Sequence, residues 1–447
     1  MTDPIDRLTA RLLDAARSAG AEAADAIAVR ATSLSIDIRA RALEQAERAE
    51  SLDVGLRVLI GGRQACVSAS DVSDGTLAAM AERAVAMARE APDDPHAGLA
   101  DPSQIAQGWD LAALEICDPA AEPSPAALEA AARAAEAAAL DRPGITQVEA
   151  TGAWSRREMH LAATNGFSGG YARSSHSMSA VAFTGSGTGM ERDWAGETRV
   201  FGADMPGPET VGALAAERAL SRVGARKPAT GRFPVLYDER VAASLLGHLL
   251  AAVNGSAIAR GGSWLRDALG QPVLPESLSF IEDPLRPRTG LARPFDAEGL
   301  PTARRAIVDN GILTGWTLDL ATGRKLGLPS TANAARSTSQ PPSPSVAGTE
   351  LTQGAATRDE LIAAMGTGLL VTSLMGSSIN GNTGDYSRGA AGFWIENGQI
   401  AWPVNECTIA GNLREMLRTL VPANDARPHL SSRVPSLLVE GLTIAGA

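Results

Sequence analysis

Side chains that commonly bind metals are scarce in this sequence. The 447 residues include five histidines, and the two closest are 16 residues apart. No helix can therefore carry two imidazoles one turn apart, the arrangement that zinc hydrolases often use. The three cysteines form no CxxC pair, which argues against a disulfide framework and fits a reducing compartment. These cysteines are Cys66, Cys117 and Cys407.

Aromatic residues, basic charge and long apolar runs are also limited. Aromatics make up 4% of the chain, and 40 basic residues face 51 acidic ones, for a net charge of −11. Nucleic-acid binders depend on a basic surface to neutralise phosphates, so this class is excluded. No stretch of about 20 apolar residues could span a membrane, and the N-terminus has no apolar signal region. We therefore expect a cytoplasmic protein.

The length favours two domains, because a chain of this size is too long for one hydrophobic core. A polar segment with proline and glycine, ARKPATGR at 225–232, marks the expected boundary. We expect an α+β fold. Residues 1–225 would pack helices on a mixed or antiparallel sheet, and residues 226–447 would form a strand-rich domain with a few helices.

Turn and cap residues locate the expected elements. Helices are predicted at 5–20, after an Asp74 cap, from Ser124–Pro125 to about 140, and at 209–223. Strands are expected at 34–38, 52–60 and 64–70, followed by an antiparallel run over 147–201. In that run Asn165–Gly166 should form a type I′ hairpin turn. The same Asn-Gly chemistry predicts hairpins at 307–313 and 394–400.

The C-terminal region is predicted to alternate strands with short helices. Helices are expected at 238–253, 358–365 and 412–420. A long Ser/Pro loop, STSQPPSPSVA, is expected at 337–347.

Two side chains could act as nucleophiles. Ser387 lies in GDYSRG, where Asp385 replaces the glycine of a nucleophile elbow, and Cys407 has no neighbouring histidine as a base. A tight polar loop and a packing residue are the simpler readings, but a hydrolase that uses either residue stays an alternative. The glycine-rich GSGTG at 185–189 lacks the apolar helix that a phosphate site requires.

Five glycines occur in GSSINGNTGDYSRGAAG at 376–392. Ordering so many glycines costs conformational entropy, which suggests a close backbone approach to another chain, to an extended peptide or to the loop itself. Function and simple turn formation are both open.

Ordered matches to one family run from about residue 50 onward. They include LDVGLRVLIGGRQACVSASD at 52–71, DDPHAGLAD at 93–101, TNGFSGG at 164–170, FDAEGLPTARRAIVDNGILTGW at 295–316, STANAARS at 330–337, GSSINGNTGDYSRGAAGFWIENGQIAWPVNECTIAGNL at 376–413 and VPSLLVEGLTIAGA at 434–447. In these segments the chain resembles the PmbA/TldE proteins, the partners of the TldD metallopeptidase.

The resemblance implies a heterodimer in which a TldD-like chain supplies zinc or a similar metal through an HExxxH helix. The equivalent helix here, SLLGHLLAAVNGS at 244–256, places Gly247, His248 and Ala252 on the motif. A further cysteine ligand is missing from 426–434. This chain would then be the non-catalytic, metal-free subunit of a complex that degrades unfolded or modified peptides. The resemblance also offers a role as a modulator of DNA gyrase.

Two loops are the candidate substrate-binding or partner-contacting segments, since a strand-rich domain can offer backbone groups to an extended peptide. Turns that close the β-domain are the structural alternative, and a homodimer of the isolated chain stays open. The candidate residues are Ser330, Asn333, Arg336, Asn380, Asn382, Thr383, Gly384, Asp385, Tyr386 and Ser387.

Overall fold

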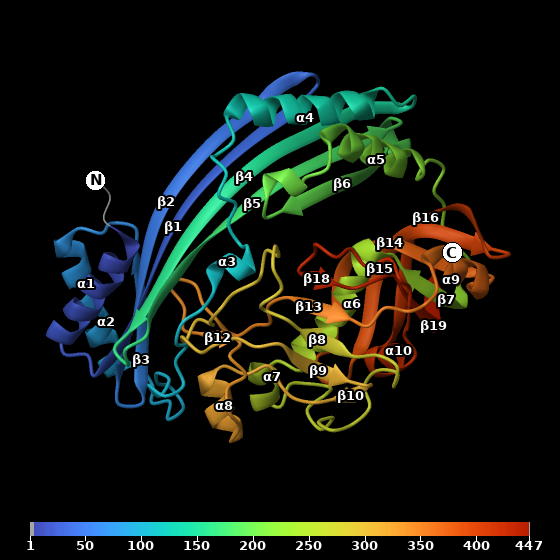
Figure 1. The fold of residues 1–447 in the computed structure, drawn as a ribbon. Coiled ribbons are helices and arrows are strands. Elements are labelled where there is room, and N and C mark those ends of the chain that lie inside the picture. Colours follow the sequence, from blue (N-terminus) through green and yellow to red (C-terminus); the bar gives the residue numbers. More distant parts are fainter. Residues whose placement is uncertain (1–3, 447) are drawn as a thin grey trace.

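The computed structural model describes residues 4–446, in which an N-terminal half arches over a C-terminal half (Figure 1). Within these residues the N-terminal sheet has six antiparallel strands in the order β3-β2-β1-β4-β5-β6. The strands are β1 (Ala23–Arg39), β2 (Ala42–Ile60), β3 (Arg63–Ala69), β4 (Ile145–Ala163), β5 (Ser168–Thr184) and β6 (Glu191–Arg199). The helices are α1 (Ile5–Ser18), α2 (Asp74–Glu90), α3 (Leu111–Leu114), α4 (Pro125–Leu140), α5 (Pro208–Leu220) and the 3₁₀ turns η1 (Gly187–Gly189) and η2 (Gly202–Asp204).

Alternation along β1 separates the two faces of this sheet, because successive strand residues point to opposite sides. Ala24 and Ala26 pack in one cluster with α1 and α2, and Ile36 packs in another with α4 and α5. Ile27, on the other face, packs with Phe295 of the C-terminal half. The helices thus cover one face, and the C-terminal half lies against the other.

The C-terminal half is built around a second six-stranded sheet with the order β16-β15-β14-β7-β19-β17 in the described residues. A further pairing of β16 with β19 closes five of these strands into a small barrel. The strands are β7 (Gly231–Tyr237), β14 (Gly368–Ile379), β15 (Asp385–Glu396), β16 (Gln399–Asn412), β17 (Val421–Pro422) and β19 (Leu437–Ala445). Helix α6 (Glu239–Ala252) contributes leucines to the core beside the barrel strands.

Shorter elements surround the barrel. One sheet has the order β10-β9-β8-β13-β18, and a separate two-stranded ribbon pairs β11 with β12. Their bounds are β8 (Phe280–Glu282), β9 (Arg305–Asp309), β10 (Ile312–Leu313), β11 (Ala334–Ala335), β12 (Ser343–Pro344), β13 (Thr349–Leu351) and β18 (Ser432–Arg433). The remaining helices are α7 (Gly255–Ala259), α8 (Leu320–Leu326), α9 (Arg358–Met365) and α10 (Leu413–Arg418).

The α+β fold class is confirmed, and most of the expected elements are present. Ser124 caps α4 by accepting a hydrogen bond from Ala127 N, with Pro125 in the first turn. Asn310 and Asn397 both adopt positive φ before a positive-φ glycine, as the two Asn-Gly hairpins require.

Three local predictions are wrong. Gly166 has a φ of +99° but Asn165 does not adopt positive φ, so the turn is not type I′; Asn165 Oδ1 accepts a hydrogen bond from Phe167 N instead. The cap of α2 is Ser73, and Asp74 is the first helical residue. The Ser/Pro stretch at 337–347 is not entirely loop, because β12 pairs with β11 there.

The domain boundary expected between residues 225 and 226 stays a prediction. Buried contacts join the two halves on either side of it. No helix among residues 4–446 is long and apolar enough to cross a membrane.

Candidate functional site

Helix α6 carries the residues that the resemblance aligns with a metal-binding motif. Asp238 caps it by accepting a hydrogen bond from Arg240 N at 3.2 Å, and the leucines on its inner face pack against the core. Gly247 is exposed, His248 is half-buried and Ala252 is buried. Of the three motif positions, His248 alone offers a side chain that could bind a metal.

His248 lies against aromatic residues of the barrel. Its ring centroid is 5.7 Å from that of Tyr386 on β15, with the rings at 72°. The Tyr386 hydroxyl is 3.4 Å from the hydroxyl of Tyr237, the last residue of β7. His248 Nε2 is buried without a hydrogen-bond partner. Burial, assisted by the positive charge of Arg388, lowers the pKa of His248, so the imidazole is neutral at physiological pH.

A metal does not fit this site. Among the residues that the structure describes, no group of three or more His, Cys, Asp or Glu side chains is placed to bind an ion. His248 packs on the Tyr386 phenol and lies near the Arg388 guanidinium, and a guanidinium repels a cation. No catalytic step is therefore assigned to a metal in this chain.

The glycine-rich segment forms the β14–β15 hairpin, and its turn is stabilised by its own side chains. Asn380 Oδ1 accepts hydrogen bonds from Asn382 N at 3.0 Å and Thr383 N at 3.3 Å. The Asp385 carboxylate accepts from Thr383 Oγ1 at 2.6 Å and from Asn412 Nδ2 at 3.1 Å. Asn382, Thr383 and Asp385 nonetheless remain exposed to solvent. This turn is held by its own side chains and presents polar groups outward.

Gly384 and Tyr386 lie on the buried side of the hairpin. Gly384 is buried with a φ of +84°, and a Cβ there would lie 3.4 Å from the Trp264 ring. Tyr386 is 2% exposed and belongs to the core. These two predicted site residues contribute to packing, while their exposed neighbours form the surface.

One edge of β14 is open. Strand β7 pairs only with Leu369–Val371, and no other described strand continues on that side along residues 372–379. Met375 in this segment is 56% exposed, and the nearby Trp194 of β6 is 53% exposed. A concave surface at this edge is lined by Trp194, Arg240, Val241, Ser244, Thr372, Ser373, Leu374 and Arg388.

The two candidate nucleophiles lack a base. Cys407 is 4% exposed, donates to Ala390 O at 3.2 Å, and has a pKa raised by burial to about 11. The Ser387 hydroxyl has no hydrogen-bond partner within residues 4–446, so no histidine or carboxylate activates it. The geometry does not favour a hydrolase built on either residue.

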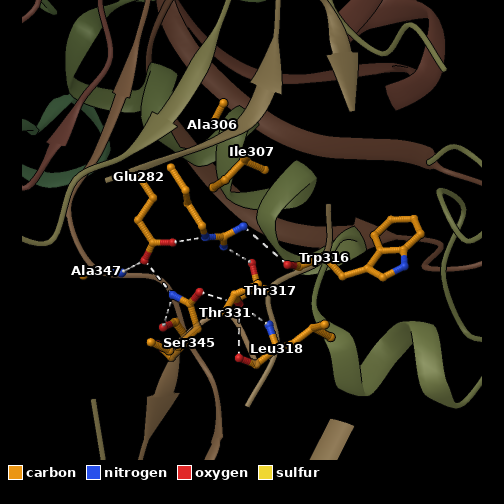
Figure 2. Close-up of polar contacts among 12 residues, drawn as sticks. Glu282, Ala306, Ile307, Trp316, Thr317, Leu318, Thr331, Ser345 and Ala347 are labelled. Carbon is orange, nitrogen blue, oxygen red and sulfur yellow. Dashed lines mark hydrogen bonds and ion pairs between the residues drawn. The ribbon is translucent and has the colours of Figure 1, made fainter. Parts of the chain in front are cut away.

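The loop at 330–337 is part of a buried polar network (Figure 2). Asn333 is 2% exposed and donates to Glu282 Oε1 at 2.7 Å, while Thr331 Oγ1 donates to Asn333 Oδ1 at 2.7 Å. The other Glu282 oxygen accepts from Arg305 Nε at 2.8 Å. Ser330 Oγ donates to Leu318 O at 3.2 Å. These side chains connect neighbouring loops, which places Asn333 away from solvent.

Arg336 extends this network to the N-terminal half. Its side chain is 0% exposed and forms an ion pair with Asp25 of β1. Arg336 thus reaches the N-terminal sheet, whereas Ser330 and Asn333 bond within the C-terminal half and the hydrogen bonds of 380–387 stay near the hairpin. The structure does not join the two predicted segments by a hydrogen bond. Sequence reasoning did not identify Tyr237, Arg388 or Trp194, because tertiary contacts place Tyr237 beside Tyr386 and Arg388 on one surface with Trp194.

Three family models match the chain. They are PmbA/TldA metallopeptidase domain 1 at residues 24–88, the central domain at 118–223 and the C-terminal domain at 230–446. "Metalloprotease PmbA" of Escherichia coli O157:H7 is 36% identical over 98% of this chain and 95% of its own length. The chain belongs to the PmbA/TldD metallopeptidase family. A "Metalloprotease PmbA homolog" of Haemophilus influenzae is 33% identical over 97% of this chain and 94% of its own length.

Solved structures of PmbA/TldD-like proteins share the fold. A Bacteroides thetaiotaomicron protein described as a candidate modulator of DNA gyrase superposes with a TM-score of 0.92 at 28% identity, over all of both chains. TldE from Thermococcus kodakarensis has a TM-score of 0.86 at 18% identity, over 98% of this chain and all of its own. At that identity the second likeness supports the fold alone.

Proposed function

We propose that this chain is the metal-free subunit of a PmbA/TldD-family peptidase, and that a second family member supplies the metal. The observation that carries the proposal is the composition of α6, where Gly247 and Ala252 occupy the positions aligned with two histidine ligands. The half-buried, neutral His248 packs on Tyr386 in place of an ion. A zinc peptidase site needs three protein ligands and an open position, so hydrolysis must take place on the partner.

The open edge of β14 is the surface that we assign to the partner or to an extended peptide. A free strand edge offers unpaired N–H and C=O groups, which bind an extended chain with little demand on its sequence. The exposed Met375 and Trp194 add apolar area beside this edge. That combination suits unfolded peptides and a protein partner better than a small polar substrate.

The first experiment measures metal and peptidase activity together. The purified chain, a TldD-like chain carrying HExxxH, and their mixture are each assayed for bound metal and for cleavage of an unfolded peptide. We expect less than stoichiometric metal and no cleavage for this chain alone, and chelator-sensitive cleavage for the mixture. Stoichiometric metal together with cleavage by the isolated chain would overturn the proposal.

The second experiment tests the β14 edge. Met375→Glu places a charge on the exposed edge without touching the core, so it should weaken assembly with the TldD-like chain by at least about tenfold. Met87→Glu is the matched control, because Met87 is 44% exposed on α2 of the N-terminal half. Equal assembly of both variants, measured by analytical ultracentrifugation, would exclude this edge as the interface.

Modulation of DNA gyrase is the second candidate function. The Bacteroides thetaiotaomicron and Thermotoga maritima proteins that share this fold are described in those terms. The net charge of −11 permits contact with gyrase subunits but does not favour contact with DNA. A pull-down that retains gyrase and no TldD-like chain would promote this function over the peptidase proposal.

A further inference from the structure

A cavity of about 260 Å³ lies between the N-terminal sheet and the loops of the C-terminal half. It shares no lining residue with the α6 and β14 surface. The apolar and aromatic part of its lining consists of Ile27, Met159, Tyr171, Phe295 and Val346. The described residues that bring charge to the cavity are Arg157, Arg173, Arg293, Arg336 and Asp296.

The one acidic residue in this lining already accepts hydrogen bonds from backbone amides. Asp296 is 1% exposed, and its carboxylate accepts hydrogen bonds from Glu298 N at 2.9 Å, Leu300 N at 3.0 Å and Ala334 N at 3.0 Å. These three bonds hold a tight loop together. Four guanidinium groups therefore line the cavity against a single carboxylate among the lining residues.

Two of the arginines retain an unused donor. Arg336 pairs with Asp25 through Nη1, but its Nη2 is buried without a hydrogen-bond partner, and its side chain is fully shielded from solvent. Arg293 donates to Ala334 O at 3.1 Å and Ser345 O at 2.9 Å, yet its Nε is also buried without a partner. Buried charged donors without acceptors are costly, so a ligand that supplies oxygens is favoured.

Asp25 does not remove this excess of positive charge, because two arginines share it. Its Oδ2 accepts from Arg57 Nε at 2.7 Å while Oδ1 receives Arg336. Nearby Glu298 cannot compensate at neutral pH, since burial and the adjacent Asp296 raise its pKa to about 8. The interface between the halves thus has more guanidinium than carboxylate charge.

The cavity opens to solvent on one side. Arg157 is exposed at that side and Leu291 is 49% exposed, whereas Ile27, Phe295 and Ala347 form a floor that is at most 5% exposed. Ser345 and Ala347, which Figure 2 shows beside the Glu282 network, also line the cavity. A ligand entering here would meet arginines and apolar rings together.

We propose that this cavity binds a small oxyanion carried on an apolar or aromatic group, either a carboxylate or a phosphate monoester. Planar guanidinium groups match the oxygens of both, and the aromatic wall accommodates the carrier. The site is independent of the peptidase proposal, because it uses none of the α6 or β14 residues.

Binding is tested on the full chain by calorimetry and by thermal unfolding, with phenylacetate, phenyl phosphate and the neutral phenylacetamide as probes. We expect at least one anion to bind and to raise Tm, and the amide to do neither. The two anions distinguish a carboxylate site from a phosphate site. The proposal is overturned if neither anion has an effect at about 10 mM, or if the amide binds equally well.

Arg157→Met tests whether the anion binds in this cavity. Arg157 is exposed at the cavity mouth, so the change should leave the buried Arg336–Asp25 ion pair intact. It should weaken anion affinity by about tenfold, the usual effect of losing one charge-assisted hydrogen bond. Arg156→Met is the control, because Arg156 is the adjacent exposed residue on the opposite face of β4. Equal affinities of the two variants would contradict the assignment.

Discussion

Arg336 and Asp25 form a buried ion pair between residues that lie 311 positions apart in the sequence. Their side chains are 0% and 4% exposed, and the pair fastens the loop at 330–337 to the first strand of the N-terminal sheet. The same carboxylate also receives Arg57 of β2. This contact makes the two halves depend on each other for stability.

Asp25→Asn should destabilise the protein by about 3–5 kcal/mol, because removing one partner leaves buried guanidinium groups without a counter-charge. Asp14→Asn is the control, since Asp14 pairs with Arg17 on the surface with 72% of its side chain exposed. That change should cost no more than about 0.5 kcal/mol. Denaturant unfolding measures both, and equal losses would show that the buried pair has no special role.

Gly55→Ala should also destabilise the protein, by disturbing the packing of the two halves against each other. A Cβ at Gly55 would lie 2.1 Å from Thr338 O and 2.7 Å from Thr338 Cα, so the backbone must move. We expect a loss of at least about 1–3 kcal/mol, as for other overpacked sites. Gly75→Ala, where a Cβ meets nothing within 4 Å, should leave Tm unchanged or slightly raised. An unchanged Tm for Gly55→Ala would refute this close approach.

Glu298 should make stability fall as pH rises. Its pKa is about 8 in the folded protein against an ordinary value of 4.5, so between these values the folded state binds the proton and the unfolded state does not. The free energy of unfolding should therefore decrease with pH in this window, by up to about 1.4 kcal/mol per pH unit from this group.

The check is to compare pH profiles of unfolding for the wild type and Glu298→Gln. The amide keeps an oxygen for Leu320 N, the present partner of Glu298 Oε2 at 2.8 Å, but cannot ionise. Its profile should be flatter between pH 5 and 8. Glu90→Gln, at an exposed position on α2, should retain the wild-type slope. Parallel profiles for the wild type and Glu298→Gln would show that Glu298 is ionised in the fold.

Cys407 should be unreactive in the folded protein. With a pKa of about 11, roughly one thiol in a thousand is ionised at pH 8, and burial blocks access as well. Iodoacetamide labelling followed by peptide mapping should modify the half-buried Cys117 first, and Cys407 only after unfolding. Comparable native labelling of both would reopen Cys407 as a nucleophile.

Local turn and cap chemistry could be predicted because it depends on neighbouring residues. The Asn310 and Asn397 hairpins and the Ser124 cap form as expected. The first half of β2 could not be predicted, since ALEQAERAES at 42–51 consists largely of helix formers. Pairing along β1 imposes the strand conformation there, and the turn at Ala40–Arg41 adopts positive φ without Asn or Gly.

The sequence by itself determined the α+β class, the family and the lack of a metal-binding pair on α6. These follow from residue types, their spacing and ordered motifs, which need no knowledge of distant contacts. Tertiary structure alone decided that Asn333 and Arg336 are buried, that β14 has an open edge, and that arginines from separate segments line one cavity. The physical reason is that burial and charge balance depend on contacts between segments hundreds of residues apart, which spacing along the chain does not encode.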